Sequence, residues 1–222
     1  MENDLFKSIG CSLPKYEATL PFQKTVVSFT PFKVKDAKNI SIILQEENKK
    51  LALNALIDIL KTNTENVDIM NLCLADAEFL FLQIRSKSVD EMLNLIYNNN
   101  KVQLYIFDIM HKNSINDEVI DITPETKLTL ETPKIKDLIK LQNLDKDSLI
   151  KACIKKITHK GEIYHTNKFI PEQLNELLDN LPMNILPKIE KFLQNQPELY
   201  ATIETNDGPK EVNGFLNFFT YR

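Results

Sequence analysis

Cys153, His159 and His165 are the residues whose types and spacing come closest to a chemical site. They form a C-x5-H-x5-H pattern, and zinc binds thiolate and imidazole ligands. Standard zinc sites use other spacings and four ligands, and this set has no clear fourth ligand. We therefore expect two surface histidines and a buried cysteine here, with no metal and no cofactor.

Covalent or acid–base catalysis finds little support in the sequence. Cys153 falls on the apolar stripe of a predicted helix, where a thiol is unreactive. No serine lies in a G-x-S-x-G turn, and the four glycines form neither type of glycine-rich phosphate-binding loop. We expect no enzyme. A small intracellular enzyme that uses His111, His159 or His165 as an acid–base group is kept as an alternative.

Arg85 and Lys87 are the first candidate contact residues. Arg85 and Arg222 are the two arginines among 27 Lys and Arg residues, and Arg85 opens the segment "RSKS" after a long apolar run. A guanidinium can bind a carboxylate with two parallel bonds or hold the carbonyls at a helix end, which lysine does less well. Arg85 therefore either locks its own helix end or contacts a partner.

The segment "NGFLNFF" near the C-terminus is the second candidate. Its apolar side chains cannot all face inward on a single helical turn. The segment either docks on its own domain or anchors another chain by apolar contacts. The candidate partner-binding residues here are Phe215, Phe218 and Phe219.

The elements that position Arg85 begin with an N-terminal β-hairpin, predicted by the alternation of residues 15–30. The helical period of apolar residues predicts helices over 34–44 and 49–61. Residues 75–85 are apolar nearly all round and predict the most buried helix. Residues 88–91 fit a capping box, which predicts a new helix from Ser88 to about Tyr97 with "RSK" in the joint.

The second half of the chain alternates between strand and helix patterns. Strands are predicted in 101–110 and 115–131, and a hairpin is predicted around residues 206–209 before one apolar helical turn. The predicted helices are "KIKDLIKL", "DSLIKACIKKI", "PEQLNELLDNL" and "PKIEKFLQNQ", and "KGEIYHT" is a short extended piece.

These elements together predict an α+β fold that is mostly helical. It has an N-terminal β-hairpin, a small central antiparallel sheet and a C-terminal hairpin plus short helix. We expect residues 1–125 to hold the hairpin, helices and a β-rich insertion. Residues 126–222 would form a C-terminal helical subdomain with the terminal hairpin, unless both parts make one continuous domain.

Composition excludes several classes of protein. Hydrophobic residues make up 43% and charged residues 26%, which is typical of a folded protein. The net charge of −4 argues against a protein whose main role is to neutralise phosphates. The three cysteines lie far apart and indicate a reducing cytoplasm. We also expect no signal peptide, because "MENDLFKSIGCSL" lacks a basic region before an apolar one, and no membrane span.

Five groups of residues occur in an order that resembles a known family. They are "LPKYEATLP…VVSFTPFKVKDAKNI", "LADAEFLFLQIRSKSVDEM", "LIKACIKKI…GEIYHT", "PEQLNELLDNLP…LPKIEKFL" and "VNGFLNFF". Together they resemble the baseplate hub assembly proteins of T-even-like, contractile-tailed phages, from about Leu13 to Phe219. Arg85 and Lys87 lie in the most specific of these groups. The family pattern has a glycine where this chain has Asp90, so the geometry of this joint does not carry over strictly.

The resemblance implies a non-enzymatic role in tail morphogenesis. The protein would be either a component of the central baseplate hub or an assembly chaperone that is absent from the finished particle. Its partners would be other hub or tail proteins, met in the host-cell cytoplasm during assembly, and in the virion if it stays. Which hub protein it binds, and in what oligomeric state, is left open by the sequence.

A small nucleic-acid-binding regulator is the other alternative. It would use lysines of "KACIKKITHK" and show strongly salt-dependent binding. Because Lys151, Lys155 and Lys156 fall on a predicted helix whose other face is core, a solvated polar face explains them equally well.

Overall fold

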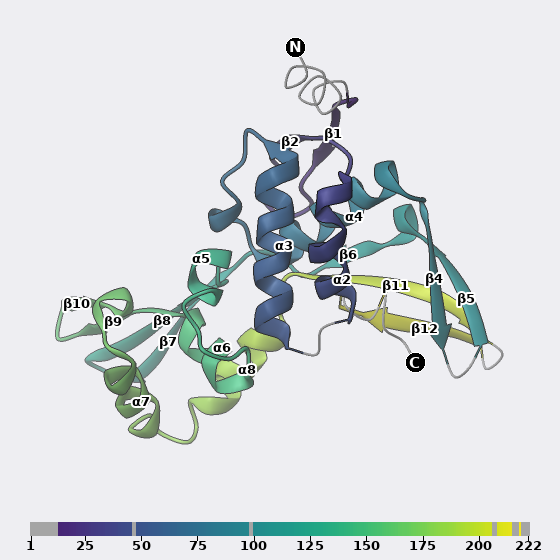
Figure 1. Ribbon diagram of the computed structural model, residues 1–222. Helices are drawn as coiled ribbons and strands as arrows, with labels where there is room; N and C mark the ends of the chain where they lie inside the picture. The colour runs from purple at the N-terminus through teal and green to yellow at the C-terminus, as the bar shows by residue number, and fades with distance from the viewer. Residues whose placement is uncertain (1–12, 46–47, 98–99, 206–207, 215–217, 219–222) are drawn as a thin grey trace, which may run out of the picture. The chain divides into compact units, whose positions relative to one another are not determined.

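The computed structural model describes residues 13–45, 48–97, 100–205, 208–214 and 218 (Figure 1). The chain divides into two compact units. The first unit comprises residues 1–112 and 198–222, and the second comprises residues 113–197.

The N-terminal strands pair as the alternation predicted. β1 (Tyr16–Thr19) and β2 (Val26–Phe29) are antiparallel, with Tyr16 opposite Phe29. β3 (Thr64–Glu65) adds to β2, so the hairpin is part of a three-stranded sheet. Val27 and Phe29 are buried, since alternate residues of β2 face the core.

Three helices supply most of the core of the first unit. They are α2 (Ala37–Gln45), α3 (Lys49–Asn63) and α4 (Leu74–Ser88). The 3-10 turn η1 (Val34–Asp36) precedes α2, and the 3-10 turn η2 (Ile69–Asn71) precedes α4. Figure 1 shows α2 and α3 side by side. The side chain of Asn48 caps α3 by accepting the backbone N–H groups of Lys50 and Leu51. Side chains on all sides of α4 are buried, as its uninterrupted apolar run predicted.

The predicted helix from Ser88 to Tyr97 is wrong. α4 continues through "RSKS", and the Ser88 hydroxyl donates to the carbonyl of Ile84 at 2.5 Å and accepts from the backbone N–H of Phe32 at 2.8 Å. Ser88 therefore ends a helix instead of starting one. Residues 92–97 form β4 (Met92–Tyr97), which pairs with β5 (Asn100–Tyr105).

A second three-stranded sheet completes the first unit. It has the order β12-β11-β6, built from β6 (Met110–Lys112), β11 (Glu198–Thr205) and β12 (Gly208–Asn213), and the 3-10 turn η3 (Ile106–Asp108) precedes β6. β11 and β12 form the predicted C-terminal hairpin. Gly208 has φ = 95°, a backbone conformation that glycine adopts without strain.

The second unit is a four-stranded antiparallel sheet with helices that contribute to one core. The strand order is β10-β9-β8-β7. The strands are β7 (Asp117–Thr123), β8 (Thr126–Glu131), β9 (Ile154–His159) and β10 (Glu162–His165), and the helices are α5 (Ile135–Leu138), α6 (Lys146–Cys153), α7 (Pro171–Asp179) and α8 (Leu186–Gln194), with the 3-10 turn η4 (Thr166–Lys168). Its buried cluster is Ile120, Leu128, Leu130, Ile150, Cys153, Ile154, Ile185, Ile189 and Phe192.

The predicted helix "DSLIKACIKKI" ends earlier than expected. α6 stops at Cys153, and the next residues enter β9, which lies between β8 and β10. Ile154 is buried, and its position relative to the preceding apolar residues fits the period of a helix as well as that of a strand. Lys155 and Lys156 are therefore strand residues.

The predicted fold class is corrected by these findings. Among the described residues there are seven α-helices. Helices, 3-10 turns included, account for 42% and strands for 32% of those described residues. Four sheets of three, four, three and two strands replace the expected N-terminal hairpin and single small sheet. None of the described helices is long and apolar enough to cross a membrane.

Candidate interaction site

Arg85 lies in the last turn of α4 and bonds to its own chain. One of its terminal nitrogens donates to the carbonyl oxygen of Asp90 at 2.7 Å and to that of Met92 at 3.4 Å. Burial lowers the pKa of the Arg85 guanidinium. These bonds connect the end of α4 to the start of β4, which supports the internal role. A partner contact at Arg85 stays a prediction.

Lys87 takes part in a network on the same surface. Its ammonium lies 2.9 Å from Glu91 Oε1, and the Tyr105 hydroxyl donates to Glu91 Oε2 at 2.7 Å. The hydrogen bonds from Lys87 and Tyr105 lower the pKa of Glu91. The Lys87 ammonium also lies 5.5 Å from the centre of the Phe107 ring, within the range of cation–π attraction. A partner role for Lys87 likewise stays a prediction.

The C-terminal aromatic residues are only partly described. Phe218 is fully buried within its own chain, which favours docking for this side chain. Phe215 and Phe219 lie outside the described residues. A partner role for Phe215, Phe218 and Phe219 stays a prediction.

The histidines and cysteines do not gather into a site. His159, in the second unit, bonds to the Thr126 hydroxyl across β8 and β9 at 2.8 Å. His111 lies in the first unit, where its ring packs edge-on against that of Phe22. Cys153 is fully buried, as predicted, and burial raises the pKa of its thiol to about 12. Among the described residues, no three His, Cys, Asp or Glu side chains are placed to hold a metal ion.

Two carboxyl groups on α4 have altered acidity. Asp76 is fully buried and accepts the backbone N–H groups of Phe22 and Gln23, each at 3.0 Å. Burial raises the pKa of Asp76, and these two bonds act in the opposite direction. Burial and then the charge of Glu198 raise the pKa of the partly buried Glu78 to about 8. The Cys73 thiol near Asp76 has its pKa raised to about 12, mainly by burial, so it is a poor nucleophile.

A groove in the second unit gathers positive charge, and we call it the lysine groove. Its volume is about 630 Å³, and it is lined by residues of α5, α6, β9, η4 and α7 and of the segments that join them. Two acidic residues, Glu131 and Asp137, line the groove. Five lysines line it: Lys134, Lys136, Lys140, Lys151 and Lys155.

One ion pair in the lysine groove is well sheltered. Lys155 Nζ lies 2.6 Å from Asp137 Oδ2, and about a fifth of each side chain is exposed. Asp137 also accepts the backbone N–H of Lys134 at 3.0 Å, which caps the start of α5. Because Asp137 is already paired, most of the remaining charge that lines the groove is positive.

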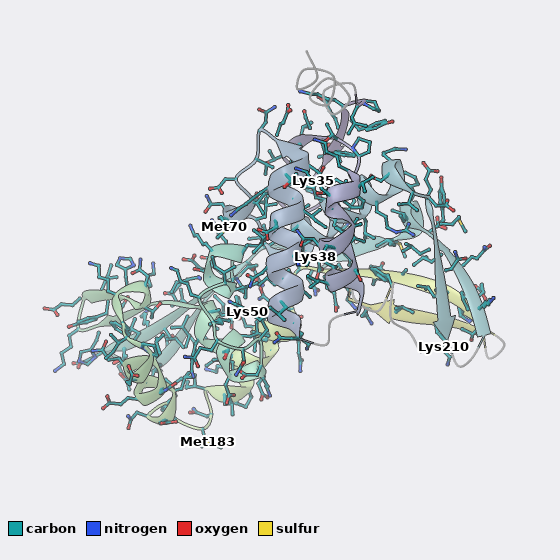
Figure 2. The ribbon with its side chains drawn as sticks, in the orientation of Figure 1. Lys35, Lys38, Lys50, Met70, Met183 and Lys210 are labelled. Carbon is teal, nitrogen blue, oxygen red and sulfur yellow. The ribbon has the colours of Figure 1, made fainter. Side chains whose placement is uncertain are left out.

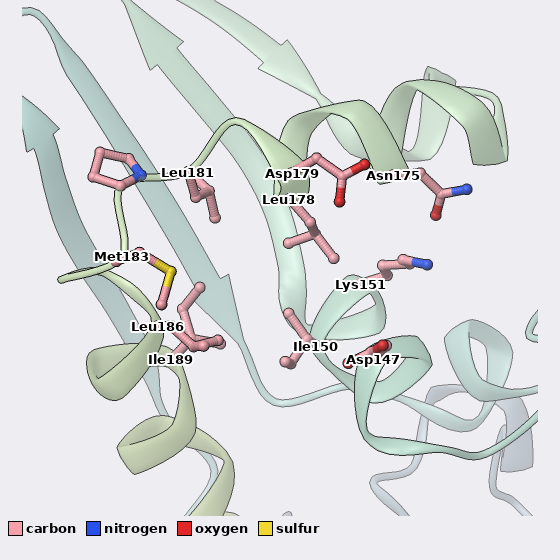
Figure 3. A pocket seen from close by; sticks show the side chains of 11 residues that line it. Asp147, Ile150, Lys151, Asn175, Leu178, Asp179, Leu181, Met183, Leu186 and Ile189 are labelled. Atoms are coloured by element: carbon pink, nitrogen blue, oxygen red, sulfur yellow. The ribbon is translucent and has the colours of Figure 1, made fainter.

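A smaller pocket adjoins the lysine groove and has a different character. It measures about 420 Å³, and Lys151 and Asn175 line both. Figure 3 shows Asp147 and Lys151 on one side and Leu178, Leu186 and Ile189 around the hollow. Its two carboxylates, Asp147 and Asp179, outnumber its one lysine. The two hollows therefore differ in the sign of their charge.

The lysine groove is not apparent from the sequence. Its lysines come from residues 134–140, which were predicted only to be helical, and from residues 151–155, which were predicted to lie on the solvated face of another helix. The signal that was present is the density of lysine in both segments. What was missing is that the start of β9 lies beside α5, where Lys155 pairs with Asp137.

The comparisons with known proteins give one match. The family described as T4 bacteriophage base plate protein matches residues 13–220. The chain belongs to this family. No curated protein and no solved structure matches it.

Membership of the base plate family agrees with the geometry. A base plate protein has a structural or assembly role, and such roles depend on surfaces rather than on reacting groups. In the described residues, the buried thiols and scattered histidines offer no reacting set, whereas the lysine groove offers a charged surface.

Proposed function

We propose that this base plate protein is a non-enzymatic tail morphogenesis protein of the central baseplate hub. It either forms part of the hub or assists its assembly, through contacts with other hub or tail proteins. The observation that carries the proposal is the family match over residues 13–220, nearly the whole chain. It acts in the host-cell cytoplasm during assembly and, if it remains in the particle, in the tail baseplate.

The chemistry of the described residues supports a role in binding. The two described cysteines are buried, and burial raises the pKa of both thiols to about 12, so neither serves as a nucleophile at neutral pH. Glu78 holds a proton at neutral pH, and the thiol of nearby Cys73, whose pKa is raised to about 12 mainly by burial, is a poor nucleophile. Binding surfaces remain as the means of action.

Mass spectrometry of washed virions beside infected-cell lysate tests the proposal. Peptides in the lysate alone would identify an assembly factor that leaves, and peptides in both would identify a hub component. Co-expression with each baseplate protein in turn is the companion measurement. A chain that is absent from virions and co-purifies with none of them would contradict the proposal.

A further inference from the structure

The lysine groove concentrates positive charge on the surface of the second unit. Lys155 is paired with Asp137. Lys134 and Lys140 are both exposed, and no ion pair with a described residue is recorded for either. Like charges brought together on one surface repel each other and lower the stability of the fold. Because this cluster of lysines lowers stability in a chain whose net charge is −4, it indicates a binding surface.

The inner wall of the lysine groove is apolar. Ala152 and Ile154 are 8% and 1% exposed, and the partly buried Phe169 and Leu174 line the same space. An occupant that fits this wall carries an apolar side chain as well as negative charge. Free phosphate or a simple anion would leave the wall uncovered.

The aromatic content of the lining favours carboxylate rather than nucleic acid as the negative group. The Lys and Arg side chains that line the groove are all lysines, which act as point charges toward carboxylate and phosphate alike, so the other lining residues decide between the two. Single-stranded nucleic acids also use several aromatic rings on which bases stack, and Phe169 is the one aromatic side chain other than His165 recorded in this lining. Glu131 interrupts the positive charge of the lining, which suits separately spaced carboxylates better than a continuous phosphate backbone.

We propose that the lysine groove binds an acidic segment of a partner protein. Carboxylates of the segment lie against Lys134, Lys136, Lys140 and Lys151, and an apolar side chain between them packs on Ala152 and Phe169. The inference rests on the proposed function in taking the occupant to be a protein. It adds the chemistry of that partner: alternating acidic and apolar residues in an extended or loosely ordered segment.

The test measures binding of the full chain to a fluorescein-labelled peptide in which glutamate alternates with leucine. Binding is detected by the fluorescence anisotropy of the peptide. Saturable binding that weakens as salt is added is expected, since exposed charges are screened beyond about 10 Å at 0.1 M salt. A peptide with glutamine in place of glutamate is expected to bind at least roughly tenfold more weakly.

A pair of charge reversals tests the location. Lys134→Glu with Lys140→Glu is expected to weaken peptide binding roughly tenfold or more, because like charges would then face the glutamates. The matched control is Lys35→Glu with Lys38→Glu, which makes the same change in net charge on exposed residues of the first unit (Figure 2). The control is expected to change the affinity by no more than about twofold. Circular dichroism of both variants establishes that each is folded.

Three results would overturn the inference: equal affinity for the glutamine peptide, equal losses in the two double variants, or tighter binding of oligothymidylate than of the glutamate peptide. The last would favour a nucleic acid as the occupant. No hub protein is present in this experiment. Its failure therefore removes the groove inference alone, whereas the virion and co-expression results decide the proposed function.

Discussion

Asp76 and Glu78 lie two positions apart on α4 and have different surroundings. Asp76 is enclosed and bonded to two backbone N–H groups of the loop after β1. Glu78 is partly buried, and the charge of the Glu198 carboxylate adds to the effect of burial in raising its pKa. Asp76 therefore holds a loop in place, whereas the raised pKa of Glu78 keeps that side chain protonated at neutral pH.

Replacing Asp76 by Asn is expected to lower the free energy of unfolding by about 2 kcal/mol. An amide offers one acceptor oxygen, so the N–H of Phe22 or that of Gln23 loses its partner in a buried place. Urea denaturation measures the loss. Asp58→Asn on the exposed face of α3 is the control and should change stability by less than about 0.5 kcal/mol.

Replacing Glu78 by Gln is expected to change how stability depends on pH. The folded chain holds the Glu78 proton up to about pH 8, whereas the unfolded chain releases it near the ordinary pKa of 4.5. Because the folded state binds more protons between these values, this group's contribution is fully present below pH 4.5 and is lost as pH rises to about 8. After allowance for partial exposure, the variant should gain about 2 kcal/mol at pH 8 and nothing at pH 4. Equal gains at both pH values would contradict this account.

At the scale of elements, the end of α4 shows what sequence patterns leave undecided. The predicted N-terminal pairing, the buried α4 and the C-terminal hairpin are confirmed, because each has a long or unambiguous pattern. The serine followed by an acidic residue at 88–91 fits a capping box, yet Ser88 bonds back to Ile84. In β4, buried Leu93 and Leu95 are separated by the polar Asn94, but this alternation is too short to separate strand from helix.

Replacing Arg85 by Lys is expected to lower the free energy of unfolding by about 1–2 kcal/mol. Lysine keeps the charge, but its ammonium on a flexible stem does not hold the carbonyls of Asp90 and Met92 in the fixed geometry of the planar guanidinium. Hydrogen exchange should show faster exchange in β4 and β5 than in the wild type. Unchanged exchange there would mean that Arg85 is retained for another reason, such as the predicted partner contact.

At the scale of the whole molecule, each of the two units has its own buried cluster. The second unit is centred on residues such as Leu128, Ile189 and Phe192. The first contains the buried Leu80 and Phe81 of α4. The lysine groove belongs entirely to the second unit. It could not be predicted because it requires β9 to lie beside α5, where Lys155 pairs with Asp137.

Replacing Phe192 by Ala is expected to destabilise the second unit by about 3–5 kcal/mol, because its ring is 1% exposed within that cluster. Hydrogen exchange should accelerate in β7, β8 and β9, and protection in α4 should stay as in the wild type. Phe81→Ala is the reciprocal variant and should act on α4 instead. Accelerated exchange in both units for either variant would show that they unfold together.

The positions of two cysteines make the natural chain its own reporter of these openings. Cys73 stands at the start of α4 in the first unit and Cys153 at the end of α6 in the second, and both thiols are buried. Alkylating reagents attack the thiolate, and burial raises the pKa of both thiols to about 12, so the closed protein resists modification at neutral pH. Cys11 lies outside the described residues. The order in which Cys73 and Cys153 are alkylated under mild denaturant would therefore show which of the two units opens first, without any added label, even within an assembling baseplate.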